Sequence, residues 1–377
     1  MTYDAERPET WPRRVLLAVT GLTPQVVTES LYALAVASVP HWVPTEICLV
    51  TTAEGAERAR LALLSEHPGW FARLRRDYRL PEIRFDSSSI RVLSDANGQP
   101  LTDIRSRADN DLAADFIAEE VRRITADADC ALHVSLAGGR KTLGFYAGFA
   151  LSLYGRPQDR LSHVLVSEPY ESSWEFFYPT PYERIITTRD NKLADCAKAE
   201  VNLADIAFVR LREELPPRLR DGRVSFIQAV AAANRALAAP RLELEVRAQR
   251  VLADGQAIEL GPTEFALLLF FAERVRSEEP EVEWSADAAR EFLGCARRVL
   301  GSGGGEYERC EKAVKACRDD AELLANYFQP QKSRLNSAFR EALGKSAAGR
   351  YEIERTGPKG QSRYRLPLAV DQVEIRS

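Results

Sequence analysis

Histidine is scarce in this chain of 377 residues, and its four copies, His41, His67, His133 and His163, all lie in the first half. The residues after His163 therefore cannot host histidine-dependent catalysis. His133 and His163 lie in apolar, strand-like stretches, where we expect buried core histidines. His41 and His67 lie in expected loops without cysteine or carboxylate partners, so we expect no metal site.

Four other features are also missing. No apolar run approaches the roughly 20 residues of a membrane span, and the first residues lack the apolar core of a signal peptide. The six cysteines form no CxxC pair, which predicts reduced, partly buried thiols in a cytoplasmic protein. No GxGxxG follows the first strand, so we expect no dinucleotide and no other cofactor. A net charge of −4 leaves only local patches to bind nucleic acid or nucleotides.

Strand-like apolar runs alternate with helical patterns through the first half of the chain. The expected strands are 14–20, 46–52, 130–136 and 161–167, and the expected helices begin near 24, 53, 109 and 141. Strands that read as continuous apolar runs between helices predict an α/β fold with a doubly wound, mostly parallel sheet. Residues 185–240 look helical and amphipathic, so we expect a first domain of residues 1–240 with a helical extension.

Ligands of such sheets bind beyond the carboxyl ends of the strands. The stretch "SLAGGRKT" (135–142) lies at one such end and resembles a phosphate loop, but Arg140 stands where a nucleotide P-loop has glycine before the lysine. Gly138 and Gly139 would let the backbone approach a ligand, while Arg140 and Lys141 would neutralise a phosphate. The alternative is a plain strand-to-helix turn; the position of Lys141 favours a ligand.

Two more polar loops follow strands, Thr20 to Gln25 and Thr51-Thr52. The first offers the hydroxyls of Thr20 and Thr23 and the amide of Gln25, although it could simply be a helix start capped by Thr23. A further polar stretch, "LTDIRSRADND" (101–111), holds Asp103, Arg105 and Asn110. Helix capping by Asp109 or Asn110 is slightly favoured there over ligand binding.

From residue 241 the pattern changes. We expect short strands around an Asp254-Gly255 turn, followed by an apolar helix at 262–275. A charged helical insertion is expected at about 277–330. A helix at 332–344 and a terminal hairpin are expected to complete the chain. This order predicts a winged helix-turn-helix-like α+β domain at 241–377. Between residues 332 and 365 nine Lys/Arg face three Glu. The helix is expected to expose Asn336 and several cations. The candidate DNA contacts are Lys332, Arg334, Arg340 and Lys359. A protein-contact domain is the alternative.

The motifs "LLAVTGLTPQVVTESLYAL", "VTTAEG", "PLTDIRSRADN", "SLAGGRKTLGFYAGFALSLYGRPQDRLSHVLVS" and "FFYP" together resemble the CRISPR-associated ring nuclease family over roughly residues 14–240. The resemblance implies a CARF domain, a Rossmann-like fold that binds cyclic oligoadenylate. It also implies a homodimer around one cyclic tetra-adenylate ring. Cleavage in this family is metal-independent: a ribose 2′-hydroxyl attacks the adjacent phosphate and leaves a 2′,3′-cyclic phosphate, which switches off type III antiviral signalling.

The resemblance also implies roles for particular residues. Lys141 would stabilise the developing charge with Arg140 and the Gly138–Gly139 amides, and Thr20, Thr23 and Gln25 would position the ribose-phosphate. The expected catalytic residues are Lys141, Arg140 and Thr23. The expected ligand-binding residues are Thr20, Gly21, Leu22, Pro24, Gln25, Thr51, Thr52, Asp103, Arg105, Asn110, Ser135, Ala137, Gly138, Gly139 and Thr142. The absence of histidine after 163 departs from CARF proteins that carry a HEPN ribonuclease domain. A non-degrading sensor that acts as a winged-helix transcriptional regulator remains the alternative function.

Overall fold

The computed structural model of the chain describes residues 3–95, 97–136, 138, 141–171, 173–216, 219–220, 222, 225–237, 239–301, 305–317, 319–357 and 362–376. These residues divide into two compact units, Met1–Arg212 with Arg223–Ala229, and Glu213–Gly222 with Val230–Ser377. Helix α7 (Phe226–Leu237) contributes residues to both. No helix in the described part of the chain is long and apolar enough to cross a membrane.

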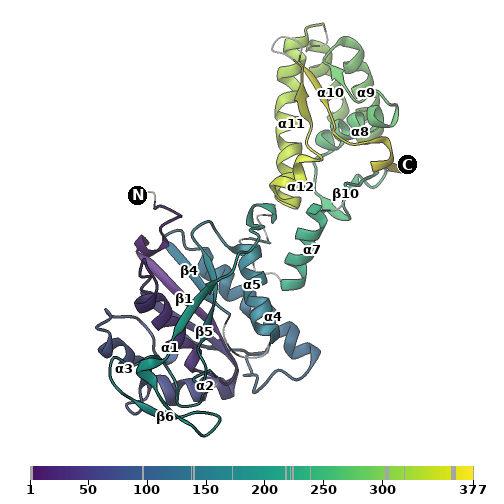
Figure 1. The fold of residues 1–377 in the computed structure, drawn as a ribbon. Helices are drawn as coiled ribbons and strands as arrows, with labels where there is room; N and C mark the ends of the chain where they lie inside the picture. The colour runs from purple at the N-terminus through teal and green to yellow at the C-terminus, as the bar shows by residue number, and fades with distance from the viewer. Residues whose placement is uncertain are drawn as a thin grey trace. The chain divides into compact units, whose positions relative to one another are not determined.

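A six-stranded sheet forms the centre of the first unit (Figure 1). Its strands, in spatial order, are β3 (Ile90–Val92), β2 (Glu46–Thr51), β1 (Arg13–Val19), β4 (Cys130–Ser135), β5 (Arg160–Val166) and β8 (Val201–Asp205). The first five are parallel and β8 is antiparallel to β5. The order 3-2-1-4-5 is that of a doubly wound, Rossmann-like sheet, which confirms the predicted fold class.

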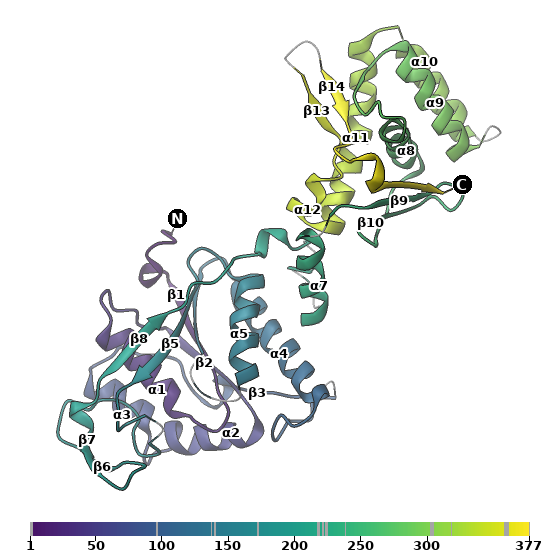
Figure 2. The same cartoon turned by 45° about the vertical axis from the view of Figure 1, so that its right-hand side comes forward.

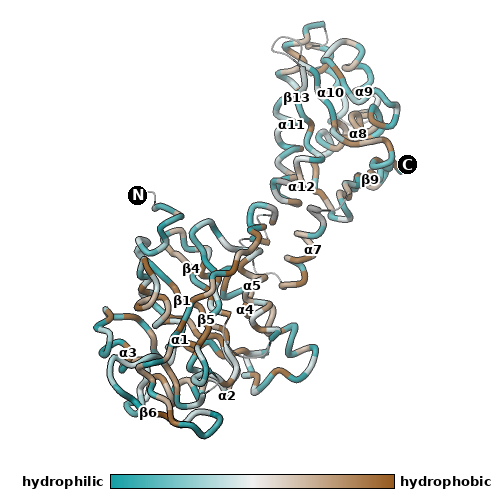
Figure 3. The backbone as a smooth tube through the Cα atoms, in the orientation of Figure 1, coloured by the Kyte–Doolittle hydropathy of each residue, from teal (hydrophilic) through white to brown (hydrophobic). Residues whose placement is uncertain are grey.

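Helices cover both faces of this sheet (Figures 1 and 2). One layer holds α1 (Gln25–Tyr32), α2 (Ala53–Ala59) and α3 (Trp70–Asp77), and the other holds α4 (Arg107–Thr125) and α5 (Lys141–Tyr154). Leu16 and Ala18 of β1 pack with Val27 and Leu31 of α1 in one core cluster. Because both faces are covered, the sheet strands carry long hydrophobic stretches, which Figure 3 shows in brown. This explains why these strands could be predicted from the sequence.

The prediction of a helical extension over 185–240 is wrong in its first half. This segment contains a hairpin of β6 (Ile185–Thr187) and β7 (Leu193–Asp195), then β8, and short 3₁₀ turns at Cys196–Lys198 and Arg212–Glu214. In β8, Leu203 pairs with Val164 of β5. The hydrogen bonds of this edge ladder override the local helical pattern. In the second half of the segment, helix α7 agrees with the prediction.

The second unit begins with a small sheet of order β11-β10-β9-β15. Its strands are β9 (Leu242–Glu245), β10 (Arg250–Ala253), β11 (Gln256–Ile258) and β15 (Val373–Arg376), the last parallel to β9. Asp254 and Gly255 have φ of 51° and 72°, as a tight two-residue hairpin turn requires. The predicted turn is therefore present.

Helices and a second sheet complete this unit. The helices are α8 (Pro262–Arg276), α9 (Ala286–Leu300), α10 (Gly305–Cys317), α11 (Ala321–Leu343) and α12 (Lys345–Gly349), and the sheet has the order β12 (Val282–Glu283), β14 (Arg363–Arg365), β13 (Glu354–Thr356). Strand β12 falls in the stretch expected to be a helical insertion, because it pairs with the distant β14. Leu335, Phe339 and Leu343 of α11 are buried on one face, as predicted. The winged-helix assignment itself stays a prediction.

Candidate functional site

The candidate site lies where the strand order reverses, at the carboxyl ends of β1 and β4. Ala18 of β1 is in register with Ser135 of β4, so the loops that follow these strands start side by side. The backbone N–H of Thr20 donates to the carbonyl of Val50 on β2 at 3.1 Å. Three of the predicted polar loops are thereby brought to one edge of the sheet, where ligands of such folds bind.

The loop after β1 is held by threonine hydroxyls that point inward. The Thr20 hydroxyl donates to the carbonyl of Thr23 at 3.1 Å, and the Thr51 hydroxyl donates to the carbonyl of Gly21 at 3.0 Å. Thr20, Thr51 and Thr52 are all buried. The expectation that Thr23 caps α1 is wrong, because the position before the helix is Pro24 and no side chain caps it. These threonines therefore set the loop's shape, and Leu22 at its tip is 38% exposed.

Two glycines let neighbouring loops approach each other closely. A Cβ on Gly55 would lie 2.1 Å from the Thr51 hydroxyl oxygen and 2.2 Å from the Gly21 carbonyl oxygen. Gly138 has φ of +87°, and a Cβ there would lie 2.9 Å from the Thr20 hydroxyl oxygen. Gly138 was expected to let a ligand approach, which stays a prediction; in the structure its lack of a side chain lets the loop after β4 lie against Thr20 of the loop after β1.

Lys141 is the first residue of α5, and its side chain and that of Thr142 are exposed. Within the described residues no carboxylate lies within ion-pair distance of Lys141, so its charge has no partner there. The first backbone amides of a helix also favour anions. The predicted site residues Ala137, Gly139 and Arg140 lie outside the described residues. Ser135 is fully buried, and its hydroxyl pairs with that of Ser30 at 2.8 Å, so its side chain belongs to the interior.

The polar stretch before α4 approaches the same edge, since the Ala53 N–H donates to the Leu101 carbonyl at 2.8 Å. Arg105 is exposed and pairs with Asp103 at 3.2 Å. The N-cap is Ser106, whose hydroxyl accepts from the Asp109 N–H at 3.1 Å. Asp109 completes a capping box, since its carboxylate accepts from the Ser106 N–H at 2.9 Å, so it takes part in capping as expected although it is not the N-cap itself.

Asn110 donates through its amide to the hydroxyl of Tyr146 on α5. This bond ties the start of α4 to α5 one turn beyond Lys141. Tyr146 was missed by sequence reasoning because nothing in its local pattern distinguishes it from a core aromatic residue.

An apolar groove of about 540 Å³ opens beside the first loop and is lined by Leu22, Pro24, Arg58 and Trp174, among others. Trp174 is 67% exposed, and the Arg58 guanidinium lies 5.7 Å from its ring centre. Gln25 is buried at the groove, where its amide donates to the Trp174 carbonyl at 3.2 Å. An exposed indole beside a guanidinium is a surface on which a planar base can stack. Trp174 was also missed, because its contact with Gln25 spans 149 residues of sequence.

The chain matches a known protein family, described as CRISPR-associated protein NE0113 (Cas_NE0113), over residues 23–238. This match covers more than half of the chain. The chain belongs to the NE0113 family of CRISPR-associated proteins. The predicted CRISPR-associated identity is therefore confirmed. No curated protein matches the chain.

Among solved structures, the NE0113-family chain is similar to Csm6 of Enterococcus italicus, a structure described as bound to cyclic hexa-2′-fluoro-hexa-dAMP. The two are 11% identical, and the similarity covers 87% of this chain and 60% of the Csm6 chain with a TM-score of 0.27.

The histidines of this NE0113-family protein take no part in the candidate site. His133 is buried, its Nε2 lies 2.7 Å from the Ser162 hydroxyl, and burial lowers the pKa of its imidazole to about 3. It is therefore neutral at physiological pH, as expected for a core residue, whereas His163 is only half-buried. In the part of the chain that the structure describes, no group of three or more His, Cys, Asp or Glu could hold a metal ion.

Two of the cations predicted to contact DNA in the second unit are paired with carboxylates. Arg334 bonds Glu264 and Arg340 bonds Glu352, each through Nε at 2.6 Å. Lys332 is partly buried with its ammonium 5.1 Å from the Tyr364 ring centre, and Lys359 lies outside the described residues.

Asn336, expected on the exposed face, is buried. Its side chain bonds both the N–H and the carbonyl of Ile353, at 3.0 and 3.2 Å. The prediction that it is exposed is wrong, because α11 packs on the chain before β13 through this residue.

Proposed function

We propose that this NE0113-family protein binds a cyclic oligoadenylate, with cyclic tetra-adenylate preferred, and cleaves it without a metal ion, which ends an antiviral signal. The observation that carries the proposal is Lys141, an exposed cation with no carboxylate partner among the described residues, at the start of α5 where the loops after β1 and β4 interlock. A phosphodiester at this place would meet the ammonium group and the first amides of the helix.

The chemistry that we propose needs alignment and charge stabilisation. The ribose O2′ bonds to the adjacent phosphorus while the P–O5′ bond breaks; O2′ loses a proton and O5′ gains one, so no water is consumed. The products carry a 2′,3′-cyclic phosphate and a 5′-hydroxyl. Lys141 stabilises the charge that grows on the phosphoryl oxygens. The buried Thr20–Thr23 and Thr51–Gly21 bonds hold the loop surface against which the ribose is aligned.

The groove beside this loop is where we place an adenine base. Leu22 and Pro24 give it apolar walls, and Trp174 and Arg58 offer planar faces for stacking. Because a cyclic tetra-adenylate has two-fold symmetry, we propose that two copies of the chain share one ring in an isologous dimer. The oligomer's mass in solution, with and without the ring, tests this part.

The decisive experiment incubates the purified chain with cyclic tetra-adenylate in EDTA and follows linear products by chromatography. We expect cleavage, and we expect Lys141→Ala to lower the single-turnover rate about 100-fold or more, as for loss of one charge-stabilising group. Lys192→Ala, which removes an exposed cation of the β6–β7 turn, is the control and should keep the full rate. Intact ligand at excess protein after long incubation would overturn the proposal.

A second candidate is a sensor that does not cleave the ring and regulates transcription through the second unit. The sheet order β12-β14-β13 beside α8, α9 and α11 is the observation that favours it, since a winged helix has this layout. The pairing of Arg334 with Glu264 and of Arg340 with Glu352 counts against it. Duplex binding that falls steeply with salt would support this candidate, and no binding at low salt would end it.

A further inference from the structure

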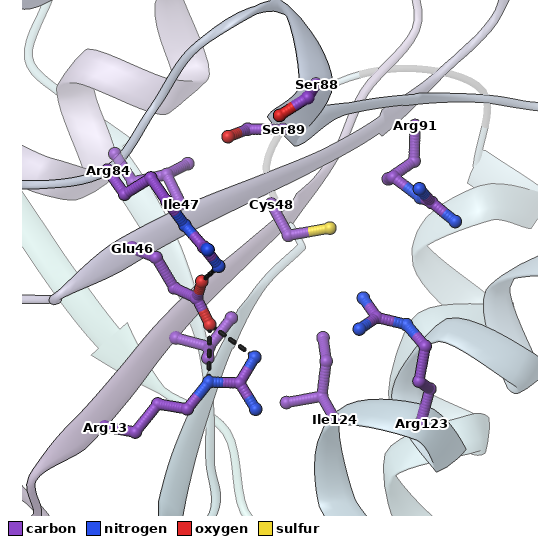
Figure 4. Close-up of a pocket in the computed structure, with 11 residues that line it drawn as sticks. Arg13, Glu46, Ile47, Cys48, Arg84, Ser88, Ser89, Arg91, Arg123 and Ile124 are labelled. Atoms are coloured by element: carbon purple, nitrogen blue, oxygen red, sulfur yellow. Dashed lines mark hydrogen bonds and ion pairs between the residues drawn. The ribbon is translucent and has the colours of Figure 1, made fainter.

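A pocket of about 370 Å³ lies at the opposite edge of the central sheet, where the parallel strands β1 and β2 begin (Figure 4). Arg13 is the first residue of β1, Glu46 is the first residue of β2, and Arg84 is bridged to Glu46. The far wall is built by Arg91 of β3 and Arg123 near the end of α4. Arg13 and Glu46 thus lie at the amino ends of their strands, away from the candidate site, whereas Arg91 is in register with Val50 near the end of β2.

Two buried carboxylates each hold two of these arginines. Glu46 accepts from Arg13 Nε at 2.6 Å and is also paired with Arg84. Glu120, which is 4% exposed, accepts from Arg91 Nη2 at 3.0 Å and from Arg123 Nη2 at 2.8 Å. Figure 4 shows the guanidinium groups of Arg91 and Arg123 directed toward the same space, across from the Arg13–Glu46–Arg84 group.

The count of charges leaves this pocket positive. Four guanidinium groups face the carboxylates of Glu46 and Glu120, and Asp127, 2.8 Å from Arg13, is a third anion, so one positive charge is in excess. Each guanidinium has five N–H donors, and a carboxylate that binds one side of the group leaves the donors on the other side available for a ligand. For Arg91 and Arg123 the bonds to Glu120 use Nε and Nη2, so Nη1 of each remains without a partner among the described residues.

The floor between the two arginine pairs does not supply a competing anion. Cys48 is buried there, and burial together with the charge of Glu120 raises the pKa of its thiol to about 12. The thiol therefore stays neutral. The side chains of Arg84, Arg91 and Arg123 remain 68%, 45% and 49% exposed, so a ligand can reach them from solvent.

We propose that this pocket binds a phosphate dianion, either inorganic phosphate or the phosphate of a nucleoside monophosphate. Planar guanidinium groups match the oxygens of phosphate and bind it through paired hydrogen bonds. The excess positive charge and the Nη1 groups of Arg91 and Arg123 that lack a partner among the described residues favour an anionic ligand. The pocket volume falls in the range of small-molecule sites and exceeds that of a bare phosphate, which favours the nucleotide. This site does not depend on the proposed ring cleavage.

The test measures binding of inorganic phosphate, AMP and adenosine to the full chain by calorimetry, at low salt. We expect AMP to bind, phosphate to bind more weakly, and adenosine not to bind. Binding by phosphate but not AMP identifies the free ion as the ligand and still supports the site. Failure of both anions to bind at millimolar concentration overturns the proposal and leaves a network that only stabilises the strand starts.

Variants locate the binding. The double substitution Arg91→Gln with Arg123→Gln should weaken AMP binding about tenfold or more, since each substitution removes a hydrogen bond to a charged group. Arg107→Gln, on the same helix but 95% exposed, is the matched control and should bind AMP as the wild type does.

Two further substitutions keep the proposal testable. Lys141→Ala should also keep AMP binding, which separates this pocket from the candidate site. If the double variant does not fold, Arg123→Lys, which retains the charge but not the paired donors, should still weaken binding. Unchanged binding in these Arg91 and Arg123 variants contradicts the assignment.

Discussion

Replacing Gly55 with alanine would test whether backbone contact between loops builds the candidate site. The new Cβ would lie 2.1 Å from the Thr51 hydroxyl oxygen and 2.2 Å from the Gly21 carbonyl oxygen, whereas real Cβ contacts under 3.0 Å are essentially never found. The clash falls on the hydrogen bond that joins these two atoms, 3.0 Å long in the native chain. The start of α2 and the loop after β1 must therefore separate.

The magnitude follows from three terms. Overpacking a well-packed site costs about 1–3 kcal/mol, and loss of the Thr51–Gly21 bond costs about 1 kcal/mol. Alanine gains up to about 1 kcal/mol over glycine within a helix. The net destabilisation is about 1–3 kcal/mol, which lowers the melting temperature of the first unit by roughly 2–12 °C.

Thermal denaturation and calorimetric titration with cyclic tetra-adenylate would check this prediction. We expect Gly55→Ala to lower both the melting temperature and the ligand affinity. Gly144→Ala is the control, because its Cβ would meet only the Leu136 carbonyl oxygen at 3.7 Å, an ordinary contact. A wild-type melting temperature for Gly55→Ala would refute the interlocked-loop reasoning, whatever the outcome for the ligand.

Three more predictions concern single side chains. Burial and the charge of Glu171 raise the pKa of Glu29 to about 8. Since this folded-state pKa lies above the ordinary value of 4.5, the folded chain holds the proton more tightly than the unfolded chain. The free energy of unfolding should therefore fall as pH rises from 4.5 to 8, by up to about 1.4 kcal/mol per pH unit. Glu29→Gln should therefore raise the melting temperature at pH 8 and not at pH 4.5, and parallel pH profiles would contradict this. Trp174→Ala should weaken cyclic tetra-adenylate binding about 5- to 150-fold, a stacking loss of about 1–3 kcal/mol. The control Leu193→Ala, at an exposed position, should bind as the wild type does. Wild-type affinity in Trp174→Ala would show that the groove is not part of the site. Asn336→Ala should destabilise the second unit by about 1–3 kcal/mol by denaturation, because the Ile353 backbone loses both partners; a loss no larger than that of the exposed Arg334→Ala would count against this role.

The sheet was predictable because strands that are buried on both faces carry apolar side chains at most positions. β1, β2 and β4 are mainly apolar, so their positions and a mostly parallel sheet could be predicted from the sequence. The strands β6 to β8 could not, because they are short, lie at an edge and depend on pairing with partners such as β5.

The candidate site was predictable as a place but not as a set of side chains. The carboxyl ends of β1 and β4 had to meet once the topology was known, and Lys141 begins α5 as expected. The sequence could not distinguish a hydroxyl that faces a ligand from one that bonds inward, as at Ser135 and Thr20. Nor could it place Trp174 beside Gln25, since no local pattern encodes a contact over so long a separation.

The contact between Gly55 and the Gly21 carbonyl has a consequence for affinity. Fixing the backbone of one flexible residue costs about 1–2 kcal/mol of conformational entropy. In this protein the turn at Thr51–Gly55 and the loop from Thr20 to Pro24 are ordered against each other by folding itself. A ligand that reaches this edge meets a surface whose shape is already set, so less of its interaction energy is spent on ordering the receptor.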